Sequence, residues 1–188
     1  MFFIGTATWG VLIILYGLIL LTRKKFMIRR ECDGIFIFFF TMLNPAIQII
    51  EMGYGIKYLI ILILSVSALV IFIARGRYTL TNVNAEMVLS ALTDILNEKN
   101  ISYGEENNTV ILKDYDSRRI TYTQSLSSVE VSLKNIRNLS IYEEVKTELK
   151  SRIKQIDLTV FPSSGLFYIV LGAILMVGMQ YFQKKLLN

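Results

Sequence analysis

Two long apolar runs, separated by a short polar turn, constrain the fold of this chain more than any other feature. The first run, residues 35–50, reads IFIFFFTMLNPAIQII, and the second, residues 58–74, reads YLIILILSVSALVIFIA. At about 1.5 Å per helical residue, each run can cross the roughly 30 Å hydrocarbon layer of a bilayer, the first only barely. We therefore expect two adjacent, antiparallel transmembrane helices.

Two further apolar runs lie near the ends of the chain, at residues 2–21 and 166–182. Basic residues follow the first of them, whereas a cleavable signal peptide carries basic residues before its apolar core, so we expect an uncleaved helix. With 53% apolar residues, the chain is predicted to be a multi-pass α-helical membrane protein with four transmembrane helices. The predicted segments are three helices within residues 1–77 (about 2–21, 35–51 and 57–74) and a fourth helix with a short tail within residues 163–188.

Basic residues beside these runs predict the orientation. The loop RKKFMIRRECDG, residues 23–34, follows the first run, and Arg75 and Arg77 follow the third. Because basic loops of membrane proteins stay on the cytoplasmic side, both segments are predicted to be cytoplasmic and both termini to be outside. The predicted localisation is the plasma membrane, with residues 78–162 in the cytoplasm. The high Ile, Asn and Lys content is typical of an AT-rich bacterial genome.

Residues 78–162 have a different, polar composition. They carry ten basic and twelve acidic residues, so the sequence pI near 9.3 comes from the flanking segments. Nucleic-acid binding needs a basic face on the folded domain, and this charge balance does not indicate one. No nucleic-acid partner is therefore expected.

Hydrophobic periodicity predicts that residues 78–162 form a small α+β domain inserted between the third and fourth helices. Asn84 is the predicted N-cap of a helix that continues to about residue 100. Ser140 and Glu143 form a capping-box pattern at the start of a second helix. An antiparallel sheet with both helices on one face fits the alternation between them. The predicted strands are residues 101–103, 109–113, 119–123 and 129–134.

The chain has no histidine and a single cysteine, Cys32. These counts exclude histidine-dependent catalytic triads, zinc motifs, intramolecular disulfides and cysteine-based metal clusters within the chain. Acidic residues at 105–106 and 114–116 are interpreted as turn residues, because Asp and Asn side chains form local backbone hydrogen bonds in turns. No catalytic residue, metal site or cofactor is predicted.

The candidate site is a polar stripe in the second predicted helix, formed by Thr41, Asn44, Gln48 and Glu51. Spacings of three and four residues place them on one helical face, beside Pro45. Because polar groups are costly in hydrocarbon, we expect this face to contact protein or water. Three interpretations stay open: hydrogen bonds that hold helices together, a face that binds a partner helix, or the lining of a conduction or substrate site.

The lack of a catalytic constellation favours a non-enzymatic integral membrane protein whose cytoplasmic α+β domain is an interaction or regulatory module. The alternative is a small oligomeric transporter or channel subunit that uses the polar stripe. A membrane enzyme with an interfacial acid such as Glu51 or Asp33 ranks last, because paired carboxylates at useful spacing on one helix are missing. The expected partners are the lipid bilayer, another membrane or cytoplasmic protein, and further copies of this chain.

Overall fold

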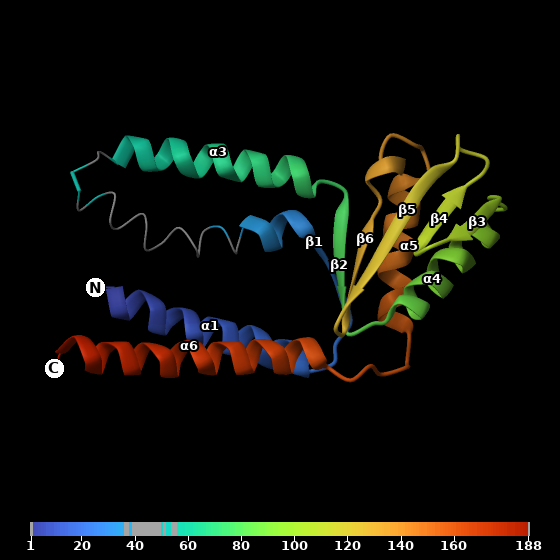
Figure 1. Ribbon diagram of the computed structural model, residues 1–188. Coiled ribbons are helices and arrows are strands. Elements are labelled where there is room, and N and C mark those ends of the chain that lie inside the picture. Colours follow the sequence, from blue (N-terminus) through green and yellow to red (C-terminus); the bar gives the residue numbers. More distant parts are fainter. Residues whose placement is uncertain (1, 36–37, 39–49, 51, 54–55, 188) are drawn as a thin grey trace. The chain divides into compact units, whose positions relative to one another are not determined.

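The computed structural model describes residues 2–35, 38, 50, 52–53 and 56–187 (Figure 1). The chain forms two compact units. We call residues 1–22, 31–74 and 164–188 the helical unit, and residues 23–30 and 75–163 the α+β unit. Each unit has its own packing and is described separately.

The helical unit contains α1 (Phe2–Leu21), α3 (Ile56–Ala74) and most of α6 (Ser163–Leu187). Glycines bring α1 and α6 together as an antiparallel pair. A Cβ atom added to Gly17 would lie 2.8 Å from the carbonyl oxygen of Gly165, and one added to Gly172 would lie 2.8 Å from that of Gly10. The two backbones are therefore so close that a side chain at these positions would force the helices apart.

The prediction of four transmembrane helices is wrong. Within the described residues, one helix, α3, is long and apolar enough to cross a membrane by length and composition. The other apolar helical stretches within the described residues are shorter and comprise residues 10–21 and 163–178. The second expected helix, residues 35–51, lies mostly outside the described residues. The multi-pass assignment, the plasma-membrane localisation and the cytoplasmic placement of residues 78–162 depended on those four helices, so they are wrong as well. Hydropathy shows that a helix is apolar, but it does not show what covers the apolar side chains. A neighbouring helix, as in the α1–α6 pair, can cover them, and so can lipid.

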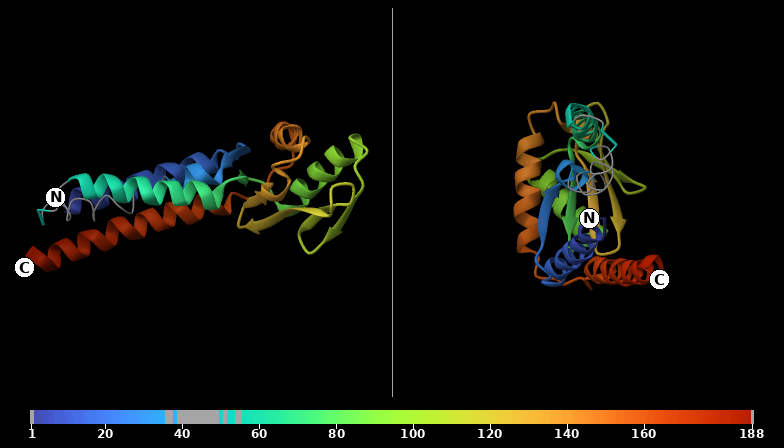
Figure 2. Two further views of the ribbon diagram at one scale, coloured as in Figure 1. Left: turned by 90° about the horizontal axis from the view of Figure 1, so that it is seen from above. Right: turned by 90° about the vertical axis from the view of Figure 1, so that its left-hand side faces the viewer.

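The α+β unit is built on a six-stranded antiparallel sheet with the order β1-β2-β6-β5-β4-β3 (Figure 1). Its two helices, α4 (Ala85–Glu98) and α5 (Tyr142–Gln155), lie on one face of that sheet, as Figure 2 shows. A short 3₁₀ helix, Lys134–Ile136, follows the last strand. The strands are β1 (Phe26–Arg29), β2 (Arg77–Thr81), β3 (Tyr103–Glu106), β4 (Thr109–Leu112), β5 (Arg118–Ser125) and β6 (Ser128–Ser132).

One hydrophobic core joins the sheet to both helices. Alternate strand residues such as Leu80, Val131 and Ile120 are fully buried, and Ile95 of α4 and Leu149 of α5 pack against the same cluster. This is the pattern expected of an antiparallel sheet that is covered on one face, where every second side chain points to the core. The core therefore fixes the positions of α4 and α5 over the sheet.

The sequence predicted most of these elements correctly. Strands β4 to β6 occur close to the predicted places, and α4 begins after Asn84, whose Oδ1 accepts a hydrogen bond of 2.9 Å from the Met87 N–H. Strand β3 was placed wrongly: the sequence predicted residues 101–103 as the strand and the acids at 105–106 as turn residues, whereas Tyr103–Glu106 form the strand because Glu105 and Glu106 pair with β4. The capping box was a wrong prediction, because α5 begins at Tyr142 and the residue before it, Ile141, makes no side-chain cap hydrogen bond.

Strands β1 and β2 are the elements of the sheet that the sequence analysis missed. The loop expected between two membrane helices contains β1, which pairs with β2 so that Phe26 lies opposite Thr81 and Arg29 opposite Tyr78. Four residues within a basic segment carry too little alternation to indicate a strand. The pairing also joins segments about fifty residues apart, which local periodicity does not reveal.

Candidate functional site

The polar stripe predicted from the sequence cannot be placed. Thr41, Asn44, Gln48 and Glu51 all lie outside the described residues, so the stripe stays a prediction. Cys32 is exposed. The described part of the chain contains no group of three or more Cys, Asp or Glu side chains that could hold a metal ion.

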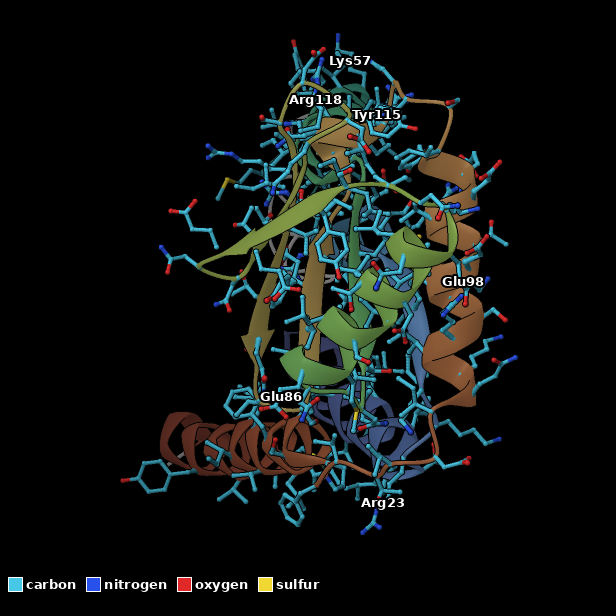
Figure 3. All side chains as sticks on the ribbon, turned by 90° about the vertical axis from the view of Figure 1, so that its right-hand side faces the viewer. Arg23, Lys57, Glu86, Glu98, Tyr115 and Arg118 are labelled. Atoms are coloured by element: carbon cyan, nitrogen blue, oxygen red, sulfur yellow. The ribbon has the colours of Figure 1, made fainter. Side chains whose placement is uncertain are left out.

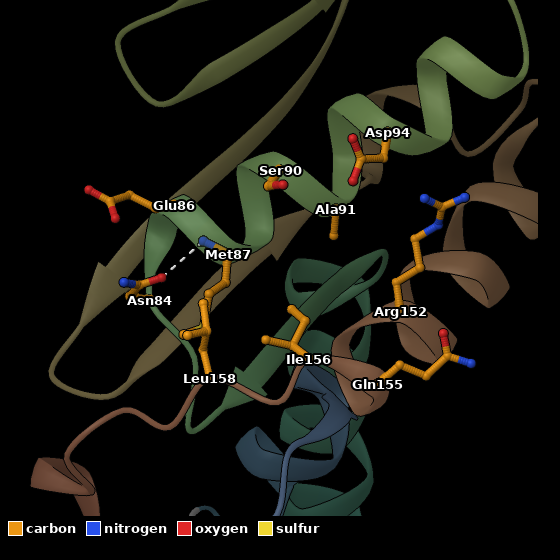
Figure 4. A pocket seen from close by; sticks show the side chains of 10 residues that line it. All are labelled: Asn84, Glu86, Met87, Ser90, Ala91, Asp94, Arg152, Gln155, Ile156 and Leu158. Atoms are coloured by element: carbon orange, nitrogen blue, oxygen red, sulfur yellow. Dashed lines mark hydrogen bonds between the residues drawn. The ribbon is translucent and has the colours of Figure 1, made fainter.

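The structure instead shows a groove of about 510 Å³ between α4 and the end of α5 (Figure 4). This volume lies within the roughly 300–1,000 Å³ that is usual for small-ligand pockets. All of its lining residues belong to the α+β unit. They are Asn84, Glu86, Met87, Ser90, Ala91, Asp94, Arg152, Gln155, Ile156 and Leu158.

Helix α4 provides both apolar and acidic side chains to the groove. Met87 and Ala91, one helical turn apart, point toward Ile156, and together these three make an apolar floor. Glu86 lies at the start of α4 and points away from this floor, whereas Asp94, seven residues after Met87, lies close to the Met87 side of the helix; both acids are exposed. The Asn84 cap fixes the helix start, and the charge of Glu86 in the first turn suits the helix dipole.

The opposite wall is formed by the end of α5 and the extended chain that follows it. Leu158 is 68% exposed, which is unusual for a leucine next to a packed core. The Lys25 Nζ donates hydrogen bonds to the carbonyl oxygens of Ile156 and, at 2.6 Å, of Leu158. Lys25 therefore ties the segment before β1 to this wall, and its charge lies where the helix dipole of α5 is negative.

Ion pairs join α4 and α5 near the C-terminal end of α4. The Lys99 Nζ lies 2.8 Å from Glu144 and 2.9 Å from Glu148, and Arg152 pairs with Glu98. We call these ion pairs the clasp. Figure 3 shows Glu86 and Glu98 at the two ends of α4; the clasp lies toward the Glu98 end, and Arg152 belongs both to the clasp and to the lining of the groove. The hydrogen bond to Glu144, which has the larger effect, and the hydrogen bond to Glu148 raise the pKa of the Lys99 ammonium.

The groove keeps a negative rim because of this arrangement. Arg152 is its basic lining residue, and Glu98 already matches that charge. Within the described residues, the carboxylates of Glu86 and Asp94 have no hydrogen-bond or ion-pair partner. Two acidic charges are therefore available to a ligand.

The two acids of the groove lie far apart on α4. Its ten lining residues contain no histidine, cysteine or tyrosine. Glu86 and Asp94 are eight residues apart on one helix, which corresponds to about 12 Å along the axis. Carboxylate pairs that act together on a glycosidic bond are separated by about 5–9.5 Å, so these two are too far apart for such paired chemistry.

A second polar cluster lies on the sheet face opposite the helices. Glu130 of β6 is 3.7 Å from the Arg30 guanidinium and 3.5 Å from that of Arg77. Among the described residues, the buried Arg77 Nε and Thr79 Oγ1 have no hydrogen-bond partner. Because Glu130 already engages both arginines, we interpret this cluster as a support for the β1–β2–β6 register.

Sequence reasoning missed the groove, although part of it was visible. Met87 and Ala91 recur at helical spacing in the sequence, which indicates an apolar face of α4, and both pack against the core in the structure. The opposite wall gave one signal, because Leu158 alternates with Ile156 and Val160 in the short stretch after α5. A contact such as Lys25 to residue 158 cannot be detected from local sequence patterns.

No protein-family model, curated protein or solved structure matches this chain. The function is therefore inferred from the geometry of the groove.

Proposed function

We propose that the α+β unit is a non-enzymatic binding module and that the groove between α4 and α5 is its ligand site. One observation carries this proposal: an apolar floor with an exposed leucine beside it lies next to two carboxylates without described partners. Exposed leucines are common one at a time, but here one borders an apolar hollow. Convergent polar groups around such a hollow are the usual composition of a recognition site.

The size of the groove suits a short segment of a larger molecule. A standard interface between folded proteins takes about 800 Å² from each partner, much more than a hollow lined by ten residues can provide. A few residues of an extended peptide can fill it, with one side chain as an anchor at the centre. Anchors of this kind dominate the affinity of small interfaces.

The test is a selection of random seven-residue peptides on the immobilised full chain, followed by affinity measurements on the enriched sequences. Leu158→Ser removes the apolar wall, and Ser90→Arg places a long side chain over the groove. Both residues are exposed, so both variants should fold. We expect each to weaken peptide binding at least about tenfold, since a buried leucine contact contributes about 1.5–3 kcal/mol.

Leu126→Ser is the matched control, because Leu126 is also an exposed leucine, 51% accessible, in the turn between β5 and β6. It should bind the peptides as the parent does. Peptides that bind equally to the parent, Leu158→Ser and Ser90→Arg would refute the groove as the site. A selection that enriches no sequence would refute the binding module itself.

The alternative, an oligomeric transporter or channel subunit, depends on the polar stripe in residues 41–51. No observation within the described residues favours it.

A further inference from the structure

We infer that the groove takes an extended peptide segment with the pattern base-x-apolar-x-base, in which two Lys or Arg side chains flank one aliphatic or aromatic anchor. This inference rests on the proposed function and names the chemistry of its ligand. It follows from three features of the groove, namely its charge, the spacing of its acids and the place of its apolar floor.

The charge comes first. Glu86 and Asp94 are exposed on the rim, while the Arg152 guanidinium is paired with Glu98 outside it. The Lys25 ammonium also lies at the wall, where it donates hydrogen bonds to the carbonyl oxygens of Ile156 and Leu158. The two rim carboxylates outnumber this one cation, so they favour a basic ligand over an anionic one.

The spacing of the two acids selects the distance between the bases. Eight residues of α4 separate Glu86 from Asp94, about 12 Å along the helix axis. In an extended strand, residues i and i+4 are about 13 Å apart, and residues i, i+2 and i+4 point to the same side. A peptide with bases at positions 1 and 5 therefore matches both carboxylates.

The apolar floor selects the residue between the two bases. Met87 and Ala91 lie between Glu86 and Asp94 in the sequence and face Ile156, with Leu158 beside them (Figure 4). The side chain at peptide position 3 shares the side of positions 1 and 5, so it is the one that reaches the floor. Met87 has an unbranched, adaptable side chain, which suits a floor that accepts either an aliphatic or an aromatic anchor.

The peptide selection on the full chain tests this pattern directly. We expect the enriched sequences to share bases at positions i and i+4 with an apolar residue at i+2. The strongest peptide is then labelled, and its affinity is measured by fluorescence anisotropy for the parent, Glu86→Lys, Asp94→Lys and the double variant. Each reversal should weaken binding several-fold and the double variant at least about tenfold, with a loss of affinity at high salt.

Glu106→Lys is the matched control, because Glu106 is an exposed acid on the edge strand β3, outside the groove. It carries the same change of charge and should bind the peptide like the parent. Circular dichroism melts of all variants establish that they are folded.

The outcomes separate this inference from the proposed function. If Leu158→Ser weakens binding but the double reversal does not, the groove binds peptides and the basic pattern is wrong. Enriched sequences without bases, or with bases only at helical spacing, overturn the pattern in the same way. If neither Leu158→Ser nor the reversals change binding, both proposals fail. Peptide binding that is lost as the chain self-associates at rising concentration would assign the groove to a second copy, and would also overturn this inference.

Discussion

The helical unit and the α+β unit both carry apolar residues in regular elements, yet they place those residues differently. In α3, Leu64 is 64% exposed and Phe72 is 73% exposed. In the α+β unit, residues such as Ile95 and Leu149 are completely buried. The difference follows from the pattern, because α3 is apolar on all sides whereas the elements of the α+β unit have one apolar and one polar face. An amphipathic element determines which of its faces is covered, and an element that is apolar on all sides does not.

The largest expected effect concerns the buried core of the α+β unit. Leu149→Ala removes a fully buried side chain from α5 and should lower the free energy of unfolding of the α+β unit by about 2–5 kcal/mol. Hydrogen exchange of α4 and β6 amides, read by mass spectrometry, measures this change. Leu64→Ala in α3 is the control and should leave those amides unaffected. Equal effects of the two substitutions would remove the distinction between the units.

The second prediction concerns the one place where the helical unit is tightly packed. Gly17→Leu adds a side chain whose Cβ would lie only 2.8 Å from the Gly165 carbonyl oxygen. We expect a loss of about 1–3 kcal/mol from the α1–α6 pair, because overpacking forces the backbones apart. Thermal unfolding followed by circular dichroism measures it. Gly178→Leu is the matched control, since nothing lies within 4 Å of a Cβ at that glycine; a larger loss there would contradict the close packing.

A smaller effect tests the start of α4, on which the groove depends. Asn84→Ala removes the side-chain acceptor of the Met87 N–H and should cost the α+β unit about 1 kcal/mol. Denaturant unfolding of the full chain, followed by circular dichroism, gives the value. Asn97→Ala, at an exposed position near the end of α4, should be neutral or slightly stabilising because alanine favours helix. A neutral Asn84→Ala would show that the cap does not hold the helix start.

The smallest expected effect concerns the ion-pair clasp between α4 and α5. Hydrogen bonds to Glu144 and then Glu148 raise the pKa of Lys99 in the folded chain above its ordinary value of 10.5. A group whose pKa is raised on folding stabilises the fold fully below its unfolded pKa and loses this contribution as the pH rises through its folded pKa. Lys99→Met should therefore be slightly less stable than the parent at pH 7, and this difference should vanish well above pH 10.5.

Lys150→Met serves as the comparison for the clasp, because Lys150 is exposed on α5 and forms no described ion pair. Its stability difference from the parent should show no such pH dependence. A Lys99→Met difference that persists unchanged at high pH would mean that the ammonium charge is not what joins the two helices.

The sequence by itself determined the elements whose signals are local. Asn84 marks the start of α4 because an asparagine side chain can accept from a backbone N–H three residues later. The strands β4 to β6 can be predicted because apolar side chains recur at alternate positions, and the Asn107-Asn108 turn, with positive φ at both residues, uses a residue type that tolerates this conformation.

Only the tertiary structure decided the features that depend on distant parts of the chain. Strand β1 exists because Phe26–Arg29 can pair with β2, and the groove exists because Lys25 holds the chain after α5 beside α4. What covers an apolar helix is also a property of its surroundings, which is why four apolar runs predicted more membrane helices than the structure supports. Local patterns record the preferences of one segment, whereas pairing, grooves and coverage are set by free energies shared between segments that the sequence keeps far apart.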